Sequence, residues 1–303
     1  MDERRKARDT NQITAEYFDQ ILIEMRHFDG ATPDLTLNLY GETFSTPIMM
    51  AALSHLKGQN NEGDGMVQMA QAAKLLNSVN WAGMGSIEQF DEICAIGAKS
   101  IKIIKPYADE NEVLSRIEAA EAAGAIAVGM DLDHSFSSKG TPDVVLGQLM
   151  RPRTFHEIEN YVKRTKLPFI IKGVLSPVDA QKCVDAGVQG IVVSHHHGIL
   201  PSVVPPLMVL PAIAEVVAGR FPIFVDCGIG CGTDAFKALA LGATAVSVGR
   251  PVMQPIIEKG AEGAKETIEA ITIELRSAMA RTACKTLSDI NKSLLWRADG
   301  TRF

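Results

Sequence analysis

The sequence is poor in cysteine, in aromatic residues and in long uncharged apolar stretches. Its 303 residues include five cysteines, an odd number at scattered positions, and only 6% aromatic residues. Scattered thiols do not make a disulfide framework and are typical of a reducing compartment. The composition therefore predicts a cytoplasmic protein with free thiols.

The sequence predicts neither a signal peptide nor a membrane span. Residues 1–9 are too charged for the apolar segment of a signal peptide. The most apolar long window, residues 199–218, contains four prolines and Glu215. Because such a segment does not suit a membrane helix, we expect no membrane span.

Basic residues are fewer than acidic ones: 30 Lys and Arg against 36 Asp and Glu give a net charge of -6. A basic surface field is therefore not expected, and nucleic acid is not an expected partner. The hydrophobic content of 46% is typical of a globular protein, and no low-complexity linker divides the chain. We expect a single domain, residues 1–303, with a small-molecule substrate.

What the sequence does contain is a pattern that occurs four times, a helix end with the form Ala-x-Gly-(Ala/Val) followed by an apolar stretch. Its glycines are Gly97, Gly124, Gly187 and Gly242, spaced 27, 63 and 55 residues apart. Glycine just past a helix can adopt a left-handed conformation without a Cβ penalty. The spacing fits one, two and two strand-helix units.

Four further apolar segments supply the remaining strands, at residues 46–53, 76–83, 168–174 and 222–228. Eight strands alternating with eight helices predict an α/β protein of the closed (β/α)8 TIM barrel type. We expect the barrel core at about residues 46–260 and short helical extensions at both termini. An open doubly wound sheet is the alternative, but no Gly-x-Gly-x-x-Gly follows the first strand.

The active site of such a barrel lies at the C-terminal ends of its strands, so the residues found there are the candidates. They are Ala51, Ala52, Trp81 to Met84, Lys105, Asp131, Asp133, Lys172, His195 to His197, Asp226 to Gly228, Gly249 and Arg250. Lys172 directly follows an apolar run, so its ammonium needs an anionic partner or a depressed pKa. It could form a Schiff base, act as a base, stabilise negative charge on a ligand, or simply reach the rim.

Glycine-rich segments end the last two strands, Asp226–Gly232 before a helix and Ser247–Arg250 before Pro251. Barrels often bind phosphate at this position. Glycine allows close approach of the backbone, a helix start supplies N–H donors, and Arg250 can chelate a phosphate. The two segments together predict a phosphate site, although either alone could be an ordinary tight turn.

Three consecutive histidines, His195 to His197, follow the sixth strand. With Asp131 or Cys227 they could bind zinc. Neighbouring residues of a strand point to opposite faces, so the three imidazoles do not converge easily, and we predict no metal. Other candidates could be pocket groups or ordinary loop residues: the Cys227 and Cys231 pair, His55, Asp133 and His134.

The second half of the chain resembles the FMN-dependent 2-hydroxy acid oxidases and dehydrogenases, a family that includes glycolate oxidase, lactate oxidase and mandelate dehydrogenase. The residues that carry the resemblance are 154–158, 167–180, 190–194, 225–229, 232–243, 248–251 and 279–287, and more weakly 39–48. The similarity therefore extends over most of the chain.

The resemblance implies FMN as the cofactor, with Lys172 against the N1/O2 edge of the flavin. It implies that His196 is the catalytic base and that Asp131 orients it. It also implies a larger set of flavin-binding residues: Ala51, Ala52, Gly83, Ser194 and Gly230, with Asp226, Gly228, Gly249 and Arg250 around the phosphate.

The chain departs from the family pattern where the substrate would bind. The arginine that clamps the substrate carboxylate becomes Ile199, the following glutamine becomes Leu200, and an arginine of the seventh-strand loop becomes Gly230. The third-strand Gln-Leu-Tyr pattern becomes Ile103-Ile-Lys105. Lys105, or else Arg151 or Arg153, could therefore bind an acid in a different pose.

We expect an FMN-dependent oxidoreductase that oxidises a hydroxyl-bearing, 2-hydroxy acid-like small molecule. His196 would take the hydroxyl proton while a hydride moves to the flavin. The alternatives are an FMN-dependent non-redox isomerase, of the type 2 isopentenyl diphosphate isomerase kind, and a non-catalytic flavin- or phosphate-binding barrel. The reoxidant could be oxygen, a quinone or a protein, and the resemblance implies a homo-oligomer.

Overall fold

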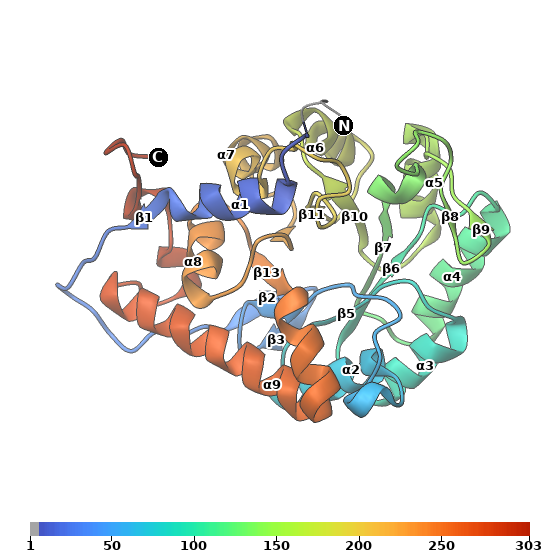
Figure 1. Ribbon diagram of the computed structural model, residues 1–303, viewed down its shortest axis with the longest axis horizontal. Helices are drawn as coiled ribbons and strands as arrows, with labels where there is room; N and C mark the ends of the chain where they lie inside the picture. Colours follow the sequence, from blue (N-terminus) through green and yellow to red (C-terminus); the bar gives the residue numbers. More distant parts are fainter. Residues whose placement is uncertain (1–5) are drawn as a thin grey trace.

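Eight parallel strands form a barrel in the computed structural model, which describes residues 6–303 (Figure 1). The strands are β4 (Ile48–Met50), β5 (Asn80–Ala82), β6 (Ser100–Ile104), β7 (Ala127–Asp131), β10 (Phe169–Val174), β11 (Gly190–Val193), β12 (Ile223–Val225) and β13 (Ala245–Val248). They are hydrogen-bonded in the order β4-β13-β12-β11-β10-β7-β6-β5. A parallel bridge between Leu53 and Ala82 joins the two ends of this sheet. The predicted barrel is confirmed, and the alternative prediction of an open doubly wound sheet is wrong.

Helices follow the strands and cover the outside of the barrel. They are α2 (Gly65–Leu76), α3 (Ile87–Ala95), α4 (Glu110–Ala122), α5 (Phe155–Arg164), α6 (Pro177–Asp185), α7 (Pro206–Val217), α8 (Gly232–Ala240) and α9 (Arg250–Arg281). The four glycines of the repeated pattern end α3, α4, α6 and α8, with φ between +75° and +113°. Their left-handed conformation confirms the reason for predicting strand-helix units from their spacing.

Large apolar side chains fill the barrel interior. Trp81 of β5 packs edge-to-face against Phe224 of β12, with ring centroids 5.0 Å apart. The hairpin of β2 (Leu37–Leu39) and β3 (Glu42–Phe44) adds side chains to the same cluster. Trp81 is therefore a core residue, and its prediction as a candidate site residue was wrong because alternate residues of a barrel strand point inward.

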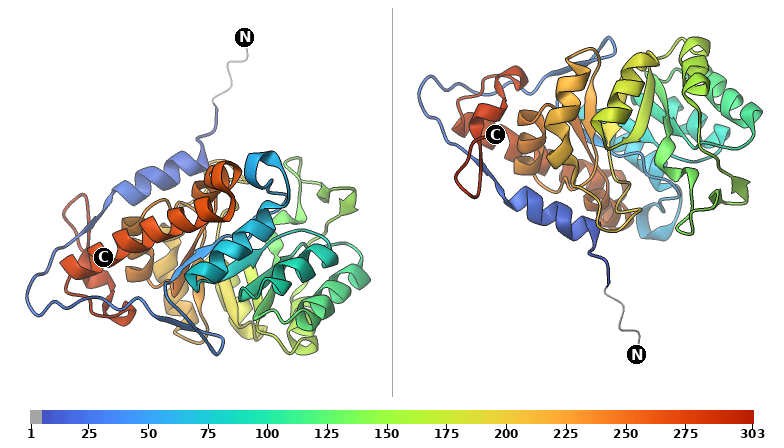
Figure 2. Two further views of the ribbon diagram at one scale, coloured as in Figure 1. Left: turned by 90° about the horizontal axis from the view of Figure 1, so that it is seen from below. Right: turned by 90° about the horizontal axis from the view of Figure 1, so that it is seen from above.

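The terminal segments differ in part from the predicted helical extensions. A helix does form at the N-terminal side, α1 (Thr10–Asp19), but it leads into β1 (Ile21–Ile23), which pairs antiparallel with β14 (Leu295–Arg297). Between α9 and β14 the chain forms two 3₁₀ turns, η3 (Leu287–Asp289) and η4 (Lys292–Leu294). Figure 2 shows α1 on the same side of the barrel as the start of α9.

Shorter elements complete the loops at the C-terminal ends of the strands. The loop after β4 contains η1 (Gln59–Asn61). The connection from β7 to α5 contains η2 (Leu132–Ser135) and the hairpin of β8 (Val144–Val145) and β9 (Gln148–Leu149). Among residues 6–303, no helix is both long and apolar enough to cross a bilayer.

Candidate functional site

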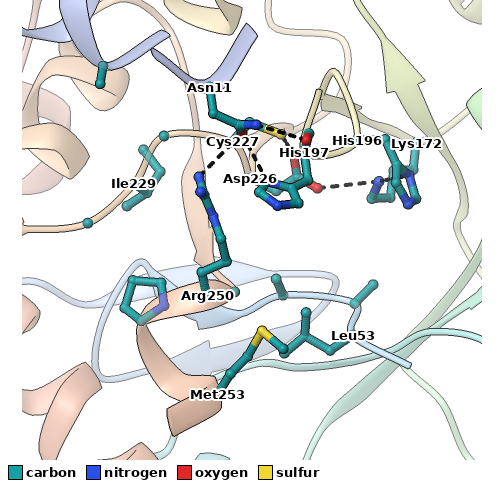
Figure 3. A pocket seen from close by; sticks show the side chains of 17 residues that line it. Asn11, Leu53, Lys172, His196, His197, Asp226, Cys227, Ile229, Arg250 and Met253 are labelled. Atoms are coloured by element: carbon teal, nitrogen blue, oxygen red, sulfur yellow. Dashed lines mark hydrogen bonds and ion pairs between the residues drawn. The ribbon is translucent and has the colours of Figure 1, made fainter. Parts of the chain in front are cut away.

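A cavity of about 830 Å³ opens at the C-terminal ends of the barrel strands, where sites of this fold lie (Figure 3). Its walls come from α1 and from the ends of β4, β10, β11, β12 and β13. The lining residues are Asn11, Ala15, Ala51, Ala52, Leu53, Lys172, His196, His197, Asp226, Cys227, Gly228, Ile229, Gly230, Gly249, Arg250, Pro251 and Met253. Most of the predicted cofactor-binding residues are thereby brought together.

A buried carboxylate, Asp131, links two lysines below this cavity. Asp131 ends β7 and is 3% exposed. Its Oδ2 lies 2.7 Å from Nζ of Lys105, and its Oδ1 lies 3.3 Å from Nζ of Lys172. Burial opposes ionisation of Asp131, but Lys172, His196 and Lys105 hold its pKa well below the usual range. Asp131 is therefore an anion throughout the physiological range.

Lys172 is buried in β10, 5% exposed, among carboxylates. Besides Asp131, its Nζ lies 3.4 Å from Oδ2 of Asp226 and 4.0 Å from Oδ2 of Asp133. Burial opposes its charge, yet the three carboxylates raise its pKa well above the usual range. Lys172 is therefore a fixed cation, and the geometry does not favour a neutral amine acting as a base or a Schiff-base nucleophile.

His196 lies beside Lys172 at the edge of the cavity. Its Nδ1 is 3.1 Å from Nζ of Lys172, 2.9 Å from Oδ1 of Asp133 and 3.4 Å from Oδ1 of Asp131. A left-handed backbone, φ 48°, and a hydrogen bond from its own N–H to Oγ of Ser194 hold it there. Burial alone would lower its pKa, but the two carboxylates raise it.

The negative charge of Asp133 has fewer close cationic partners than that of Asp131. Among residues 6–303, neither of its oxygens accepts a hydrogen bond of regular geometry, and the ion pair with His196 is its closest polar contact. Burial, and then the negative charge of Asp131, raise its pKa to about 6. The net charge of this site therefore changes at slightly acid pH, where Asp133 takes up or loses its proton.

His134 contacts the opposite side of the His196 ring. The Nε2 atoms of the two rings are 2.9 Å apart, and Nδ1 of His134 lies 3.2 Å from Oδ2 of Asp143. Burial, followed by the positive charges of Lys105 and His196, lowers the pKa of His134 to about 4. The sequence is compatible with His134 as either a pocket residue or a loop residue, and it gives no signal for Asp143.

The other two histidines of the triplet turn toward α1. Nε2 of His195 lies 2.9 Å from Oγ1 of Thr14, and Nδ1 of His197 lies 2.9 Å from Oδ1 of Asn11. The three imidazoles therefore have three different sets of partners and do not converge on one point. The divergence comes from the turn after β11, where His196 and His197 have φ of 48° and 57°, and the expected strand alternation does not apply because β11 ends at Val193.

One group of metal-binding side chain types does lie close together within residues 6–303, namely Asp131, Asp133 and His196, whose ligand atoms are within 4.8 Å. The ammonium groups of Lys105 and Lys172 already contact the same carboxylates. A metal ion would have to displace these two cations, so the arrangement does not favour a metal.

The cysteines of the seventh-strand loop do not contact each other as a redox pair would. Cys227 lies 3.1 Å from Oδ1 of Asp226, whereas Cys231 lies 3.1 Å from Oγ1 of Thr233. Burial raises the pKa of the Cys227 thiol to about 12, so it is not a reactive thiolate. All five cysteines are free, as predicted.

Arg250, at the start of α9, provides positive charge at the other end of the cavity. Its Nη2 donates a hydrogen bond of 3.4 Å to Oδ1 of Asn11. Gly228 and Gly249 also line the cavity, and the φ of +86° and the missing Cβ at Gly228 let α1 pack there, because a Cβ would meet Thr14 and Phe18. Two amides at the start of α8 are already bound, because Gly230 donates to Asp234 (3.1 Å) and Gly232 donates to Glu274 (2.7 Å).

Several predicted residues lie beside the cavity rather than in its wall. Gly83 fills the seam between β4 and β5, where its N–H donates to the carbonyl of Leu53. Lys105 is bound to Asp131, and the hydroxyl of Ser194 binds the backbone of His196. His55 is exposed in the first loop.

The two arginines considered for substrate binding form ion pairs outside the cavity. Arg151 and Arg153 form ion pairs with Glu110 and Glu157 at the starts of α4 and α5. Ile199 and Leu200 are exposed in the loop after β11. Asn11 and Ala15 of α1 line the cavity although the sequence had given no sign of it, because the contact depends on packing between distant segments.

Comparison with known proteins gives a consistent result. The family model described as FMN-dependent dehydrogenase matches residues 1–153 and 137–297. A peroxisomal (S)-2-hydroxyacid oxidase of Arabidopsis thaliana is 30% identical, over 88% of this chain and 82% of its own. An L-lactate oxidase of Roseobacter sp. is 42% identical over 51% of this chain and 42% of its own. A mandelate oxidase variant, solved with the monooxide FMN adduct, has a TM-score of 0.85 at 28% identity and covers 96% of this chain and 93% of its own.

The residues of the cavity fit FMN. The buried cation Lys172 is suited to the electron-accepting edge of the flavin, Arg250 to the phosphate, and Gly249, whose Cβ would lie against Ala51 and Leu53 of the cavity wall, to close approach of the backbone. Ala51, Leu53 and Met253 supply an apolar wall for the ring. FMN is thus the cofactor, and the chain belongs to the FMN-dependent dehydrogenase family.

Proposed function

We propose that the protein oxidises a hydroxyl-bearing, 2-hydroxy acid-like small molecule with FMN. The observation that carries the proposal is the position of His196 and Lys172 together at one end of a cavity that holds Arg250 at its other end. The sequence relatives named above are a 2-hydroxyacid oxidase and an L-lactate oxidase. They do not favour the non-redox isomerase or the non-catalytic barrel.

For the cofactor we propose that Arg250, Gly228, Gly230 and Gly249 surround the phosphate. Asp226, which the resemblance also places there, contacts the ammonium of Lys172 at 3.4 Å, and we propose that it lies nearer the flavin end of the cofactor. Lys172 would lie against the N1/O2 edge, where its fixed charge stabilises a reduced, anionic ring. Ala51 and Ala52 would contact the ring, while Gly83 and Ser194 would shape the site from beside the cavity. Bound FMN supplies a hydride acceptor.

For the chemistry we propose His196 as the base that takes the hydroxyl proton. Asp131 and Asp133 stabilise the imidazolium that this step creates, since both carboxylates lie within 3.4 Å of its Nδ1. Lys105 then acts through Asp131, to which it is bound at 2.7 Å, and does not contact the substrate in this arrangement. This assignment replaces the hypothesis that Lys105 anchors a substrate acid.

The test is the reduction of the FMN-loaded protein under anaerobic conditions. Glycolate, L-lactate and (S)-mandelate are mixed with it, and the loss of oxidised flavin absorbance is recorded. We expect at least one to reduce the wild-type protein and His196→Ala to bind FMN but lose about two to four orders of magnitude in rate. His156→Ala is the control, because His156 is an exposed histidine paired with Glu159. Unchanged reduction of His196→Ala would contradict the assignment.

We further propose one domain for residues 1–303, a homo-oligomer, a cytoplasmic location and oxygen as reoxidant. The single domain is supported by Phe18 and Leu295, which belong to the same core cluster as the barrel strands. The free thiols suit a reducing compartment. Oxygen is supported by the oxidase names of the relatives. Light scattering measures the mass of the oligomer. A single cooperative unfolding transition would indicate one domain, and peroxide formed during turnover would identify oxygen as the reoxidant.

A further inference from the structure

Helix α1 reaches the phosphate end of the cavity through the side chain of Asn11. This side chain lies between Arg250 and His197, which belong to two different loops of the barrel (Figure 3). Its Oδ1 accepts a hydrogen bond from Nη2 of Arg250 at 3.4 Å and lies 2.9 Å from Nδ1 of His197. Its Nδ2 donates to the carbonyl of His197 at 3.0 Å. One amide therefore links the start of α9 to the loop after β11.

The orientation of this amide follows from the groups that it meets. The carbonyl of His197 can only accept a hydrogen bond, so it must face the NH2 group of Asn11. The amide oxygen then faces the guanidinium of Arg250 and Nδ1 of His197, and this Nδ1 therefore carries a hydrogen. Asn11 thus presents Arg250 with an acceptor in a fixed direction.

The backbone around Asn11 holds it in this position. Asp9 is the N-cap of α1 and accepts a hydrogen bond of 2.8 Å from the backbone N–H of Asn11. Gly198, with φ +81°, leaves room for the amide, because a Cβ there would lie 2.9 Å from Nδ2 of Asn11. The hydroxyl of Thr10 ties the same turn of α1 to the carbonyl of Leu200 at 2.7 Å. The place of Asn11 is therefore set by the protein itself.

Arg250, by contrast, is exposed, and among residues 6–303 Asn11 is the only side chain that hydrogen-bonds its guanidinium. A long side chain loses rotamer entropy when a ligand fixes it, and a partner that restricts it beforehand lowers this cost. The contact with Asn11 uses one N–H of Arg250. The other guanidinium donors stay available to a phosphate.

We propose that Asn11 is a positioning residue for the FMN phosphate, because it directs the guanidinium of Arg250 along the cavity and is itself held by His197. The inference rests on the proposed function, in which Arg250 binds this phosphate. Asn11 acts through Arg250: its NH2 group is used by the carbonyl of His197 and by Asp9, at 3.0 and 3.3 Å, and its oxygen cannot donate to a phosphate. A helix outside the barrel thereby contributes to cofactor affinity.

The experiment is a double-mutant cycle on flavin affinity, measured by fluorescence titration of the full-length apoprotein with FMN and with riboflavin. Asn11→Ala should weaken FMN binding about three- to tenfold, the range of one ordinary hydrogen bond, and leave riboflavin binding unchanged. In the Arg250→Gln background the same substitution should have no further effect, because the residue through which Asn11 acts is gone. Gln12→Ala is the matched control, since Gln12 is the next residue of α1, exposed and hydrogen-bonded to Glu16.

Asn11→Asp is the second variant, and it serves alone should Asn11→Ala fail to fold. It should weaken FMN at least as much, because its carboxylate would pair with Arg250 and compete with the phosphate. An equal loss for both flavins would show that Asn11 only anchors α1, and would overturn the inference. Full FMN affinity in Asn11→Ala, or an undiminished loss in the Arg250→Gln background, would also overturn it. Unchanged FMN affinity in Arg250→Gln itself would instead contradict the proposed phosphate site, and the inference with it, so the two failures are distinguishable.

Discussion

Replacing Arg250 by glutamine tests the phosphate end of the cavity. Arg250 has Asn11 as its hydrogen-bonding side chain, at 3.4 Å, and lines the cavity. The family position that would add a second arginine is Gly230, and the amides of Gly230 and Gly232 already bind Asp234 and Glu274. The phosphate would therefore depend mainly on this one guanidinium.

The magnitude follows from the strength of charged hydrogen bonds. They contribute about 1.5–3 kcal/mol each, and about 1.4 kcal/mol is tenfold in Kd, so FMN should bind about 10- to 150-fold more weakly to Arg250→Gln. Riboflavin, which lacks the phosphate, should bind both proteins equally. The assay is fluorescence titration of the apoprotein with each flavin, with Arg276→Gln on the exposed face of α9 as the control. An equal loss for both flavins, or no loss for FMN, would refute the reasoning.

Three further substitutions test the charges of the site. Gly230→Arg should tighten FMN about tenfold in the same titration, because a Cβ there meets only Oδ2 of Asp234, at 3.6 Å, and the new guanidinium can reach the phosphate; weaker binding would contradict this. Lys172→Met should destabilise the fold by about 3–5 kcal/mol in urea, since it leaves buried carboxylates without their cation, whereas exposed Lys182→Met should change little. Asp133→Asn should stabilise the protein: the folded-state pKa of Asp133, about 6, lies above the ordinary 3.8, so ionising it weakens the fold progressively between these values and fully above pH 6. Urea titrations should then show the gain at pH 8 and its disappearance near pH 4, and a gain of equal size at both would speak against a charge effect.

The barrel could be predicted because its periodic features are local. Gly97, Gly124, Gly187 and Gly242 mark helix ends through a backbone conformation that other residues rarely adopt. Apolar runs buried on both faces mark parallel strands. The positions of Lys172 and Asp131 followed from these strands, and their pairing in the register of β10 and β7 brings the two side chains together.

What could not be predicted depends on contacts between distant segments. Asn11 lines the cavity only because α1 packs over the loop after β11, where its side chain contacts His197. The contact of His134 with Asp143 depends on the fold of the long loop after β7. The sequence also did not show that Trp81 points into the barrel, because all three residues of β5, including the polar Asn80, are buried and none is exposed to mark the outer face.

The most direct test of the account is a crystal structure of the FMN complex. We expect the phosphate against the guanidinium of Arg250 and the glycines at 228 and 249, with the ring over Ala51 and its N1/O2 edge beside Lys172. His196 should then lie beside the ring, at the edge of the cavity that it lines. FMN bound outside this cavity, or in it with the ring away from Lys172, would contradict the account.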